Sequence, residues 1–255
     1  MPTPIALFTG RNKIIADVSH PTPTLPSLDD VASLLPDDAK PLPVHADTLE
    51  LLTLNIPSWT DTPTLVAVDF RPLFFQMDHD LFSAACKAKQ IAFWDKNSRF
   101  CPECGSPMVY HSDISRVCPS CHHETYPPIS PAIIVRIERG DDEILLVKAK
   151  NFRGDHYGLV AGFLETNETL EQCVRREVRE ETGLEISDIQ YAGSQPWPFP
   201  SGVMIGFTAK YASGDISIQA SELRDARFFR RDNLPPLPDQ MSIARQLIDA
   251  WSSRD

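Results

Sequence analysis

The spacing of apolar and polar positions changes along this chain. In the first hundred residues, short apolar runs at 48–56 and 64–70 contain the β-branched residues typical of strands. The apolar positions of 78–94 recur at helical spacing, as at Leu81, Ala85, Ala88 and Ala92. The Pro-rich stretch 19–30 before them is expected to be irregular. The pattern predicts an N-terminal domain with helices and strands over residues 1–96, whose expected role is packing or dimerisation.

From residue 129 onward the pattern is dominated by strands. The final apolar stretch has helical spacing and places Ile243, Leu247 and Trp251 on one side. A mixed sheet flanked by helices is the natural packing of such elements, which form a domain over residues 130–255. The predicted elements are a hairpin at 131–150 that turns at 140–142, strands at 157–163, 203–212 and 225–231, and a closing helix at 242–252.

One further predicted helix carries glutamates where its buried face should be. Leu170 and Val174 begin an apolar stripe that continues as Glu177 and Glu181, and Glu180 lies beside it. Like charges this close repel one another, and burial raises their pKa values unless arginines or a divalent cation neutralise them. Such oxygen ligands suit Mg²⁺ or Mn²⁺. The alternative is a solvated acidic face paired with neighbouring arginines, and the apolar phase of the helix argues against it.

Both ends of this acidic helix have sequence signals. Asn167 or Thr166 is expected to cap its N-terminus, and Gly183 is expected to end it in the left-handed conformation.

Six cysteines divide into a cluster of four and two isolated residues. Two Cys-x-x-Cys pairs can close a tetrahedral zinc site, which predicts a zinc ribbon over residues 97–129. Disulfides are the competing interpretation, but the close pairing of the cysteines and the expected cytoplasmic location argue against them. Cys86 and Cys173 lie on predicted helices and are expected to be core thiols. The predicted zinc ligands are Cys101, Cys104, Cys118 and Cys121.

Composition and charge exclude several classes of protein. The 255 residues are 42% hydrophobic, which is enough for substantial cores, and no run approaches the length of a membrane span. The first residues lack a basic start followed by an apolar stretch, so a cytoplasmic location is expected. The formal net charge of −11 argues against broad binding to nucleic-acid backbones. An anionic substrate remains compatible, because metal ions and local arginines can bind it.

With its flanks, the acidic helix resembles the signature of the Nudix hydrolases. The resemblance implies a loop, helix and loop that hold Mg²⁺ or Mn²⁺ against a diphosphate, within an α/β/α sandwich. The fold class is therefore expected to be α+β or α/β. The positions that fill the signature are Gly162, Glu168, Arg176, Glu177, Val178, Glu180, Glu181, Gly183 and Leu184.

Diphosphate cleavage requires charge neutralisation and an aligned water, which clustered carboxylates with metal ions can supply. Glu177 and Glu181 are predicted to be the principal metal ligands. Glu180 is a further ligand or the base that activates water. Arg176 and Glu168 are expected to orient the carboxylates.

A second motif, Ser-Gln-Pro-Trp-Pro-Phe-Pro-Ser-Gly at 194–202, lies just beyond the helix. Its three prolines are expected to preclude a regular central strand and to fix an extended, rigid loop that presents Trp197 and Phe199 to an aromatic ligand. The alternative is a hydrophobic contact with the neighbouring domain. The motif resembles Ser-Gln-Pro-Trp-Pro-Phe-Pro-x-Ser of the NADH pyrophosphatase subfamily. Gly202 replaces the final Ser, and Ser201 is its possible substitute.

This second resemblance also rests on the four-cysteine ribbon and on the preceding Phe-Trp and Arg-Phe-Cys of residues 93–101. It implies a homodimer that hydrolyses NADH, and more weakly NAD⁺, to a nicotinamide mononucleotide and AMP. It also implies removal of NAD caps from RNA.

Several site residues follow from the same resemblance. The backbone oxygen of Ala161 and the side chain of Glu222 are expected at the metals. Phe163 and Trp197 are expected to stack on the substrate, and Tyr126 to contact it. The implied substrate loop is Gln195, Pro196, Trp197, Pro198, Phe199, Pro200, Ser201 and Gly202, and further candidates are Asp113, Arg71 and Ala244.

Two other functions remain open from the sequence. A Nudix hydrolase could act on ADP-ribose or a dinucleoside polyphosphate instead. A zinc-ribbon binding protein could use the Nudix domain only to sense a nucleotide, but the intact set of carboxylates argues against a sensor. RNA binding by the ribbon is disfavoured, because residues 101–124 contain one Arg and no Lys.

Overall fold

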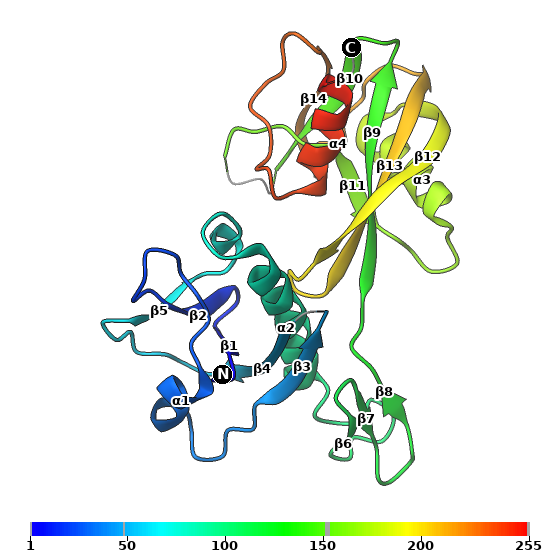
Figure 1. Cartoon of the computed structure of the whole chain (residues 1–255). Coiled ribbons are helices and arrows are strands. Elements are labelled where there is room, and N and C mark those ends of the chain that lie inside the picture. Colours follow the sequence, from blue (N-terminus) through cyan, green and yellow to red (C-terminus); the bar gives the residue numbers. More distant parts are fainter. Residues whose placement is uncertain (1, 48, 151–153, 254–255) are drawn as a thin grey trace. The chain divides into compact units, whose positions relative to one another are not determined.

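The computed structural model describes residues 2–47, 49–150 and 154–253 (Figure 1). The chain folds into two compact units. The first unit comprises Met1–Ile129 together with Trp197–Ser201, and the second comprises Ser130–Pro196 and Gly202–Asp255. Each unit has its own apolar core. No helix among the described residues is long and apolar enough to cross a membrane.

A five-stranded sheet forms the centre of the first unit. β1 pairs in parallel with β4, and the other neighbours in the order β3-β4-β1-β2-β5 are antiparallel. The predicted strands at 48–56 and 64–70 are confirmed as β4 and β5, although Thr48 lies outside the described residues. The strands are β1 (Ile5–Thr9), β2 (Lys13–Asp17), β3 (Leu42–Ala46), β4 (Leu49–Ile56) and β5 (Leu65–Asp69).

Helix α2 (His79–Asn97) confirms the helical spacing of residues 78–94. The Asp78 carboxylate caps its N-terminus by accepting from the backbone of Asp80 and Leu81. The hydroxyl of Thr53 in β4 bonds to the Ala88 carbonyl, which ties the helix to the sheet. The shorter helical segments are α1 (Leu28–Val31), η1 (Ala32–Leu34) and η2 (Arg71–Phe75). The first of them begins inside the Pro-rich stretch, because Ser27 and Asp30 form a capping box.

A small three-stranded sheet completes the first unit. Its strands are β6 (Val109–Ser112), β7 (Ser115–Val117) and β8 (Glu124–Thr125), and the four clustered cysteines lie in the turns around them.

A six-stranded mixed sheet forms the second unit, with the order β12-β13-β9-β10-β14 and β11 paired to β9. The predicted hairpin, the strands and the closing helix are all present. Its elements are β9 (Ser130–Arg139), β10 (Glu143–Ala149), β11 (Val160–Phe163), α3 (Leu170–Thr182), β12 (Glu185–Trp197), β13 (Gly202–Ser213), β14 (Leu223–Arg230) and α4 (Ile243–Ser252).

Alternate residues of β9 contribute to two separate apolar cores. Ile133 and Val135 pack in the core that contains Val174 of α3, whereas Ile134 packs in the core that contains Leu247 of α4. Successive side chains of a strand point to opposite faces, so the two helices cover opposite faces of the sheet. This arrangement is the predicted α/β/α sandwich (Figure 1).

The prediction that the Pro-rich motif is a loop throughout is wrong. Strand β12 continues through Gln195, Pro196 and Trp197, and β13 begins at Gly202. Proline is tolerated because β12 is at the edge of the sheet, where a missing N–H need not leave a neighbouring strand without its hydrogen bond. Only residues 198–201 form the turn between the two strands.

Candidate functional site

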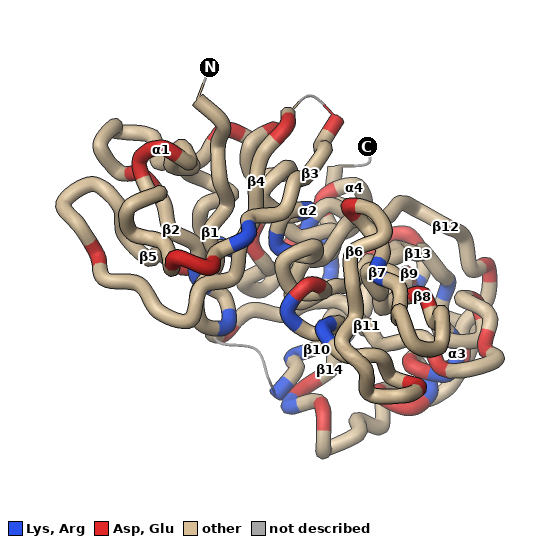
Figure 2. The backbone as a smooth tube through the Cα atoms, turned by 90° about the horizontal axis from the view of Figure 1, so that it is seen from below, with Lys and Arg blue, Asp and Glu red and all other residues tan. Residues whose placement is uncertain are grey.

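Helix α3 is fixed at both ends by backbone capping. The predicted caps Asn167 and Thr166 are wrong: Thr169 is the N-cap, and its hydroxyl and the Gln172 side chain bond reciprocally to each other's backbone N–H. Asn167 instead has a left-handed φ of 62°, unlike the extended backbone usual at an N-cap. At the other end Gly183 has φ 73°, which confirms the predicted stop. Figure 2 marks the acidic and basic residues carried by this part of the chain.

Arg176 holds three of the four signature carboxylates. Its Nε and Nη2 donate to the two oxygens of Glu168 at 2.8 and 3.0 Å, a bidentate pair. Its Nη1 donates to Glu177 at 2.8 Å and to Glu180 at 3.0 Å, and Nη2 also reaches the carbonyl of Phe163 at 3.0 Å. The hydrogen bonds from Arg176 lower the pKa of Glu168 to about 2. Arg176 therefore contacts three of the carboxylates that it is expected to orient.

Glu177 is seated against the backbone of β11. A Cβ atom on Gly162 would lie 1.9 Å from the Glu177 carboxyl carbon, so the carboxylate would have to move if a larger residue stood at this position. Glu177 is only 9% exposed, and burial raises its pKa. The Glu177 carboxylate can therefore occupy this place only beside a glycine.

Glu181 is the most strongly perturbed carboxyl of the cluster. It is 5% exposed, and burial, followed by the charges of Glu177, Glu222 and Glu180, raises its pKa to about 8. Within the described part of the chain, no hydrogen bond reaches its carboxylate. It therefore lacks the compensation that Arg176 supplies to its neighbours.

A cavity of about 370 Å³ in the second unit brings together three of the predicted metal ligands, Ala161, Glu181 and Glu222. Lys150 also lines this cavity, and its backbone N–H donates to the Glu222 carbonyl at 2.7 Å. Nothing in the local sequence around Lys150 indicated this position, because the contact depends on how β10 and β14 pair.

The donor set around this cavity fits a hard divalent cation. It offers the buried Glu181 carboxylate, the exposed Glu222 carboxylate and the Ala161 carbonyl, and Mg²⁺ and Mn²⁺ prefer such oxygen ligands. The carboxylates are not gathered on a single point, however. Among the described residues, only the four cysteines form a group of three or more His, Cys, Asp or Glu side chains whose ligand atoms lie within 4.8 Å of one another. The glutamates do not form such a group. Arg176 holds Glu177 and Glu180 instead.

The cysteine cluster is formed by two matching turns. The Gly105 N–H donates to the Cys101 carbonyl at 2.9 Å, and the His122 N–H donates to the Cys118 carbonyl at 2.9 Å. Gly105 and His122 both have positive φ, 75° and 62°. Each turn thus presents its two thiols in the same way.

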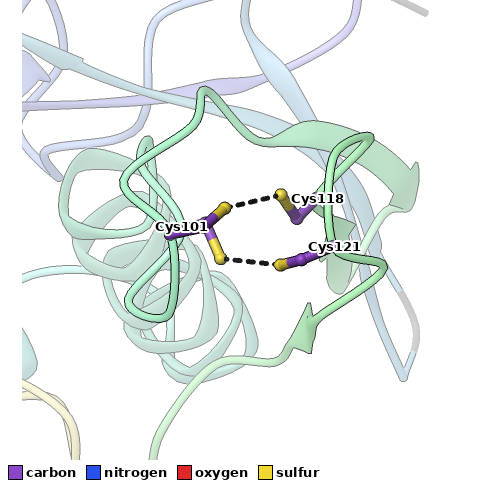
Figure 3. Close-up of side chains that lie close together, drawn as sticks. Cys101, Cys118 and Cys121 are labelled. Atoms are coloured by element: carbon purple, nitrogen blue, oxygen red, sulfur yellow. Dashed lines mark hydrogen bonds between the residues drawn. The ribbon is translucent and has the colours of Figure 1, made fainter.

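The four thiols face one another across the cluster. Figure 3 shows Cys101 and Cys118 with Cys121, and the sulfurs of Cys101 and Cys121 are 3.5 Å apart, as are those of Cys104 and Cys118. Hydrogen bonds from Ser106 are the largest cause that lowers the pKa of Cys104 to about 6, whereas a backbone hydrogen bond to Cys121 is outweighed by burial and by hydrogen bonds with the other three thiols, which raise its pKa to about 12. The geometry and the donor set fit a structural zinc ion.

Arg116, the single arginine of residues 101–124, is buried. It pairs with Asp95 of α2, donates to the Tyr110 hydroxyl at 2.7 Å and lies over the Tyr110 ring. Its charge is therefore paired with Asp95 inside the first unit, and the buried guanidinium is unsuited to bind a phosphate backbone.

The turn of the Pro-rich motif packs within the first unit, where two predicted substrate residues meet. The Arg71 guanidinium lies 5.0 Å from the centre of the Trp197 ring, close enough for a cation–π contact. Phe199 contacts Trp197 at 5.2 Å and Phe70 at 6.1 Å between ring centres. The aromatic side chains of the turn thus make a packing contact with residues of the N-terminal domain, which is the alternative to substrate binding given above.

Gln195, which precedes this turn, is occupied by a structural contact in the second unit. Its amide nitrogen donates to the Met241 carbonyl at 2.7 Å, and its amide oxygen accepts from the Ile243 N–H at 2.8 Å. This pair of bonds fixes the start of α4.

The remaining candidates are distributed over both units. In the second unit, Phe163 is 66% exposed and Ala244 is buried in the core beneath α4. In the first unit, Tyr126 is 55% exposed and Asp113 pairs with His45 at 3.3 Å.

Comparison with known proteins adds independent observations. Residues 128–251 match the family described as NUDIX domain, and residues 96–126 match the NADH pyrophosphatase zinc ribbon domain. The chain is 45% identical over 196 residues to the NAD-capped RNA hydrolase NudC of Pseudomonas aeruginosa (strain LESB58), which covers 76% of this chain and 70% of the relative. It is 44% identical over 205 residues to the protein of the same name from Stutzerimonas stutzeri (strain A1501), with 80% and 73% coverage.

A solved structure shares the fold. The crystal structure of a NUDIX hydrolase from Nitrosomonas europaea matches with a TM-score of 0.52 and 26% identity, covering 61% of this chain and 92% of that one.

Proposed function

This chain belongs to the Nudix hydrolases that carry the NADH pyrophosphatase zinc ribbon, and on this premise we propose that it hydrolyses the diphosphate of NADH and NAD⁺. The products are a nicotinamide mononucleotide, reduced in the case of NADH, and AMP. The same cleavage removes an NAD cap from RNA, the activity named for its relatives. The observation that carries the proposal is the buried and uncompensated Glu181 carboxylate on the wall of the cavity.

The proposed metal ligands are the Ala161 carbonyl and the carboxylates of Glu177, Glu180, Glu181 and Glu222. We propose Mg²⁺ or Mn²⁺ as the ion. When bound, it supplies charge neutralisation for the diphosphate and activates water. Support comes from the shared cavity of three of these residues and from the raised pKa values of Glu177 and Glu181.

The protein's own residues have distinct roles in the reaction. Arg176, anchored by Glu168, holds the carboxylates of Glu177 and Glu180 through hydrogen bonds from its guanidinium. The packing of Gly162 against Glu177 restricts that carboxylate to one position. Glu180 is 53% exposed at its side chain, so it is accessible either as a further ligand or as the base that takes the proton of water.

The proposed substrate contacts are the aromatic and polar residues Phe163, Tyr126 and Trp197, with the loop Gln195–Gly202. The cation–π contact with Arg71 supports a fixed orientation of Trp197. Since both polar atoms of the Gln195 amide are bonded to the start of α4, we assign Gln195 to positioning the loop. Asp113 and Ala244 remain proposed contributors.

Three further features belong to the proposal. The zinc ion is structural and is held by the four ribbon cysteines. The functional form is a homodimer, in which the domain of residues 1–96 contributes to the interface. The chain acts in the cytoplasm, where reduced thiols remain available to zinc.

The direct test is a comparison of substrates with the purified protein and Mn²⁺. Equal concentrations of NADH, NAD⁺, ADP-ribose and NAD-capped RNA are incubated separately, and the products are separated by chromatography. We expect a mononucleotide and AMP from the dinucleotides and a 5′-monophosphate RNA from the capped RNA. A higher kcat/KM for ADP-ribose would contradict the assigned substrate but retain the Nudix chemistry. Absence of turnover with all four would favour a nucleotide sensor.

A further inference from the structure

A second cavity, of about 480 Å³, lies in the first unit. It shares no lining residue with the cavity that contains Glu181 and Glu222. Its wall is formed by the turn between β1 and β2, one face of α2 and the turn residues Phe199 and Pro200. Four of its lining residues are basic, and none of the lining residues is acidic. In a chain with a formal net charge of −11, this is a local concentration of positive charge. The basic residues are Arg11, Lys13, Lys89 and Lys96.

Lys89 is the innermost of these cations. It is 8% exposed, and its ammonium lies 3.4 Å from the Arg11 carbonyl, a long hydrogen bond. The same ammonium is 5.3 Å from the centre of the Phe8 ring and 5.8 Å from those of Phe70 and Phe199. Within the described ranges, no carboxylate pairs with it. A buried lysine is almost always paired, so this one lacks its expected anion.

The surroundings of Lys89 do not supply a negative charge. The titratable group that acts on Lys89 is the Cys86 thiol, whose pKa burial raises to about 12, so that it remains neutral. Burial also lowers the pKa of Lys89 itself, because the charged form is poorly solvated. Cation–π contacts with three rings offset part of this cost. An anion in the cavity would offset the remainder.

We propose that this cavity binds a nucleoside monophosphate, with Lys89 as the buried contact to the phosphate and Phe8, Phe93 and Phe199 as the apolar wall for the base. This site does not include the glutamates of the proposed hydrolytic site and does not rest on them, although Phe199 and Pro200 also belong to the proposed substrate loop. The cavity volume lies in the range typical of small-ligand sites. Arg11, Lys13 and Lys96 are exposed cations around the buried one, an arrangement suited to a dianionic monoester.

The test is calorimetric titration of the zinc-loaded, full-length protein with AMP, in buffer without Mg²⁺ or Mn²⁺. Without a divalent cation the glutamates of α3 repel a phosphate, so the heat reports on the basic cavity. We expect saturable binding that is weakened about tenfold or more in Lys89→Met, because a charge-assisted hydrogen bond is lost. Lys87→Met is the matched control: Lys87 is an exposed lysine of the same helix that bonds to the His45 carbonyl and does not line the cavity. Its affinity for AMP should equal that of the unmodified protein.

Folding of the variant is checked by thermal unfolding. Met is similar in length to Lys and carries no charge to desolvate, so Lys89→Met should be at least as stable as the parent without ligand. If it fails to fold, Lys96→Met removes an exposed cation of the same cavity and should also weaken AMP binding.

Several results would overturn the assignment. Equal AMP affinity in the parent and in Lys89→Met would remove Lys89 as the phosphate contact. Inorganic phosphate that bound as tightly as AMP would remove the aromatic wall from recognition. Binding of an uncapped RNA oligonucleotide without binding of AMP would show that the cavity serves a polymer instead of a mononucleotide.

Discussion

At the scale of single residues, the acidic site depends on side chains that hold other side chains. Arg176 donates hydrogen bonds to three glutamates. Gly162 has no side chain, and this leaves room for the Glu177 carboxylate to pack on the backbone of β11. The phase of the helix was sufficient to predict that Glu177 and Glu181 are buried. The contact between Gly162 and Glu177 could not be predicted in the same way, because it joins a strand to a helix through the tertiary fold.

Gly162→Ala tests this contact. The added Cβ would overlap the Glu177 carboxylate, so the side chain must leave its position and the metal site is disturbed. We expect kcat/KM for NADH to fall by about 10-fold to 100-fold, the range typical for loss of a residue that orients a metal ligand. Steady-state kinetics at increasing Mn²⁺ measures it. Full activity with an unchanged requirement for Mn²⁺ would show that the close packing is unimportant.

Glu138 provides a pH test away from the metal site. It is 4% exposed in β9, and although burial raises its pKa, hydrogen bonds from Lys210 and Arg136 outweigh that effect and lower it. A carboxyl whose pKa is lower in the folded state stabilises the fold above its ordinary pKa of 4.5. That contribution is lost as the pH falls below this value toward the folded-state pKa.

The prediction compares the parent with Glu138→Gln in urea unfolding. At about pH 7 the variant should be less stable by about 3 kcal/mol, because it removes the Glu138 charge from beside the buried Arg136. Below about pH 4.5 the difference should shrink as the carboxylate is protonated. A difference that is the same at both pH values would mean that the ion pair does not control this part of the stability.

At the scale of elements, periodicity identified the strands and helices, whereas the Pro-rich motif was misjudged. Three prolines argued against a central strand, which agrees with the structure, but the motif was expected to be a loop, and the position of β12 at the sheet edge allows the strand to continue through Trp197. The predicted N-cap of α3 was also wrong, because the tertiary structure decides which residue caps the helix. Asn167 and Thr169 are both common caps, and the backbone conformation that decides between them is set by the preceding loop.

Gln195 joins two elements, the edge strand β12 and helix α4. Replacing it with Ala removes the donor to Met241 and the acceptor for Ile243. We expect the free energy of unfolding to fall by about 1–3 kcal/mol, the cost of leaving such partners unsatisfied. Gln190→Ala, an exposed change in the same strand, should cost less than about 0.5 kcal/mol. If Gln195→Ala raised KM without changing stability, direct substrate contact would be the better assignment.

The zinc ribbon is an element whose order depends on its metal. A strong chelator should remove about one zinc ion per chain and expose the four ribbon thiols to a thiol reagent. Cys173 should stay unreactive, because it lies on the buried face of α3 and burial raises its pKa to about 12. Thiol titration with and without the chelator measures both. Retention of protected ribbon thiols after zinc release would indicate that the ribbon folds without metal.

At the scale of the whole molecule, charge and composition described the chain less well than its local patterns. The net charge of −11 gave no indication of the basic cavity around Lys89, because that cavity is assembled from a turn, a helix and a distant hairpin. By contrast, the spacing of the cysteines was sufficient to predict their cluster, and the helical phase was sufficient to predict that Glu177 and Glu181 are buried. Such motifs are local in sequence, so their geometry is set by one or two neighbouring elements.

The central claim is that the buried glutamates of α3 support metal-dependent cleavage of the NADH diphosphate. The measurement that tests it most directly is Mn²⁺-dependent release of AMP from NADH by the parent, by Glu181→Gln and by Glu171→Gln, an exposed change in the first turn of the same helix. We predict that activity falls by a factor of about 100 or more in Glu181→Gln, as expected for loss of a metal ligand on which the reaction depends, and is unchanged in Glu171→Gln. Equal activity of the parent and a folded Glu181→Gln protein would contradict the account.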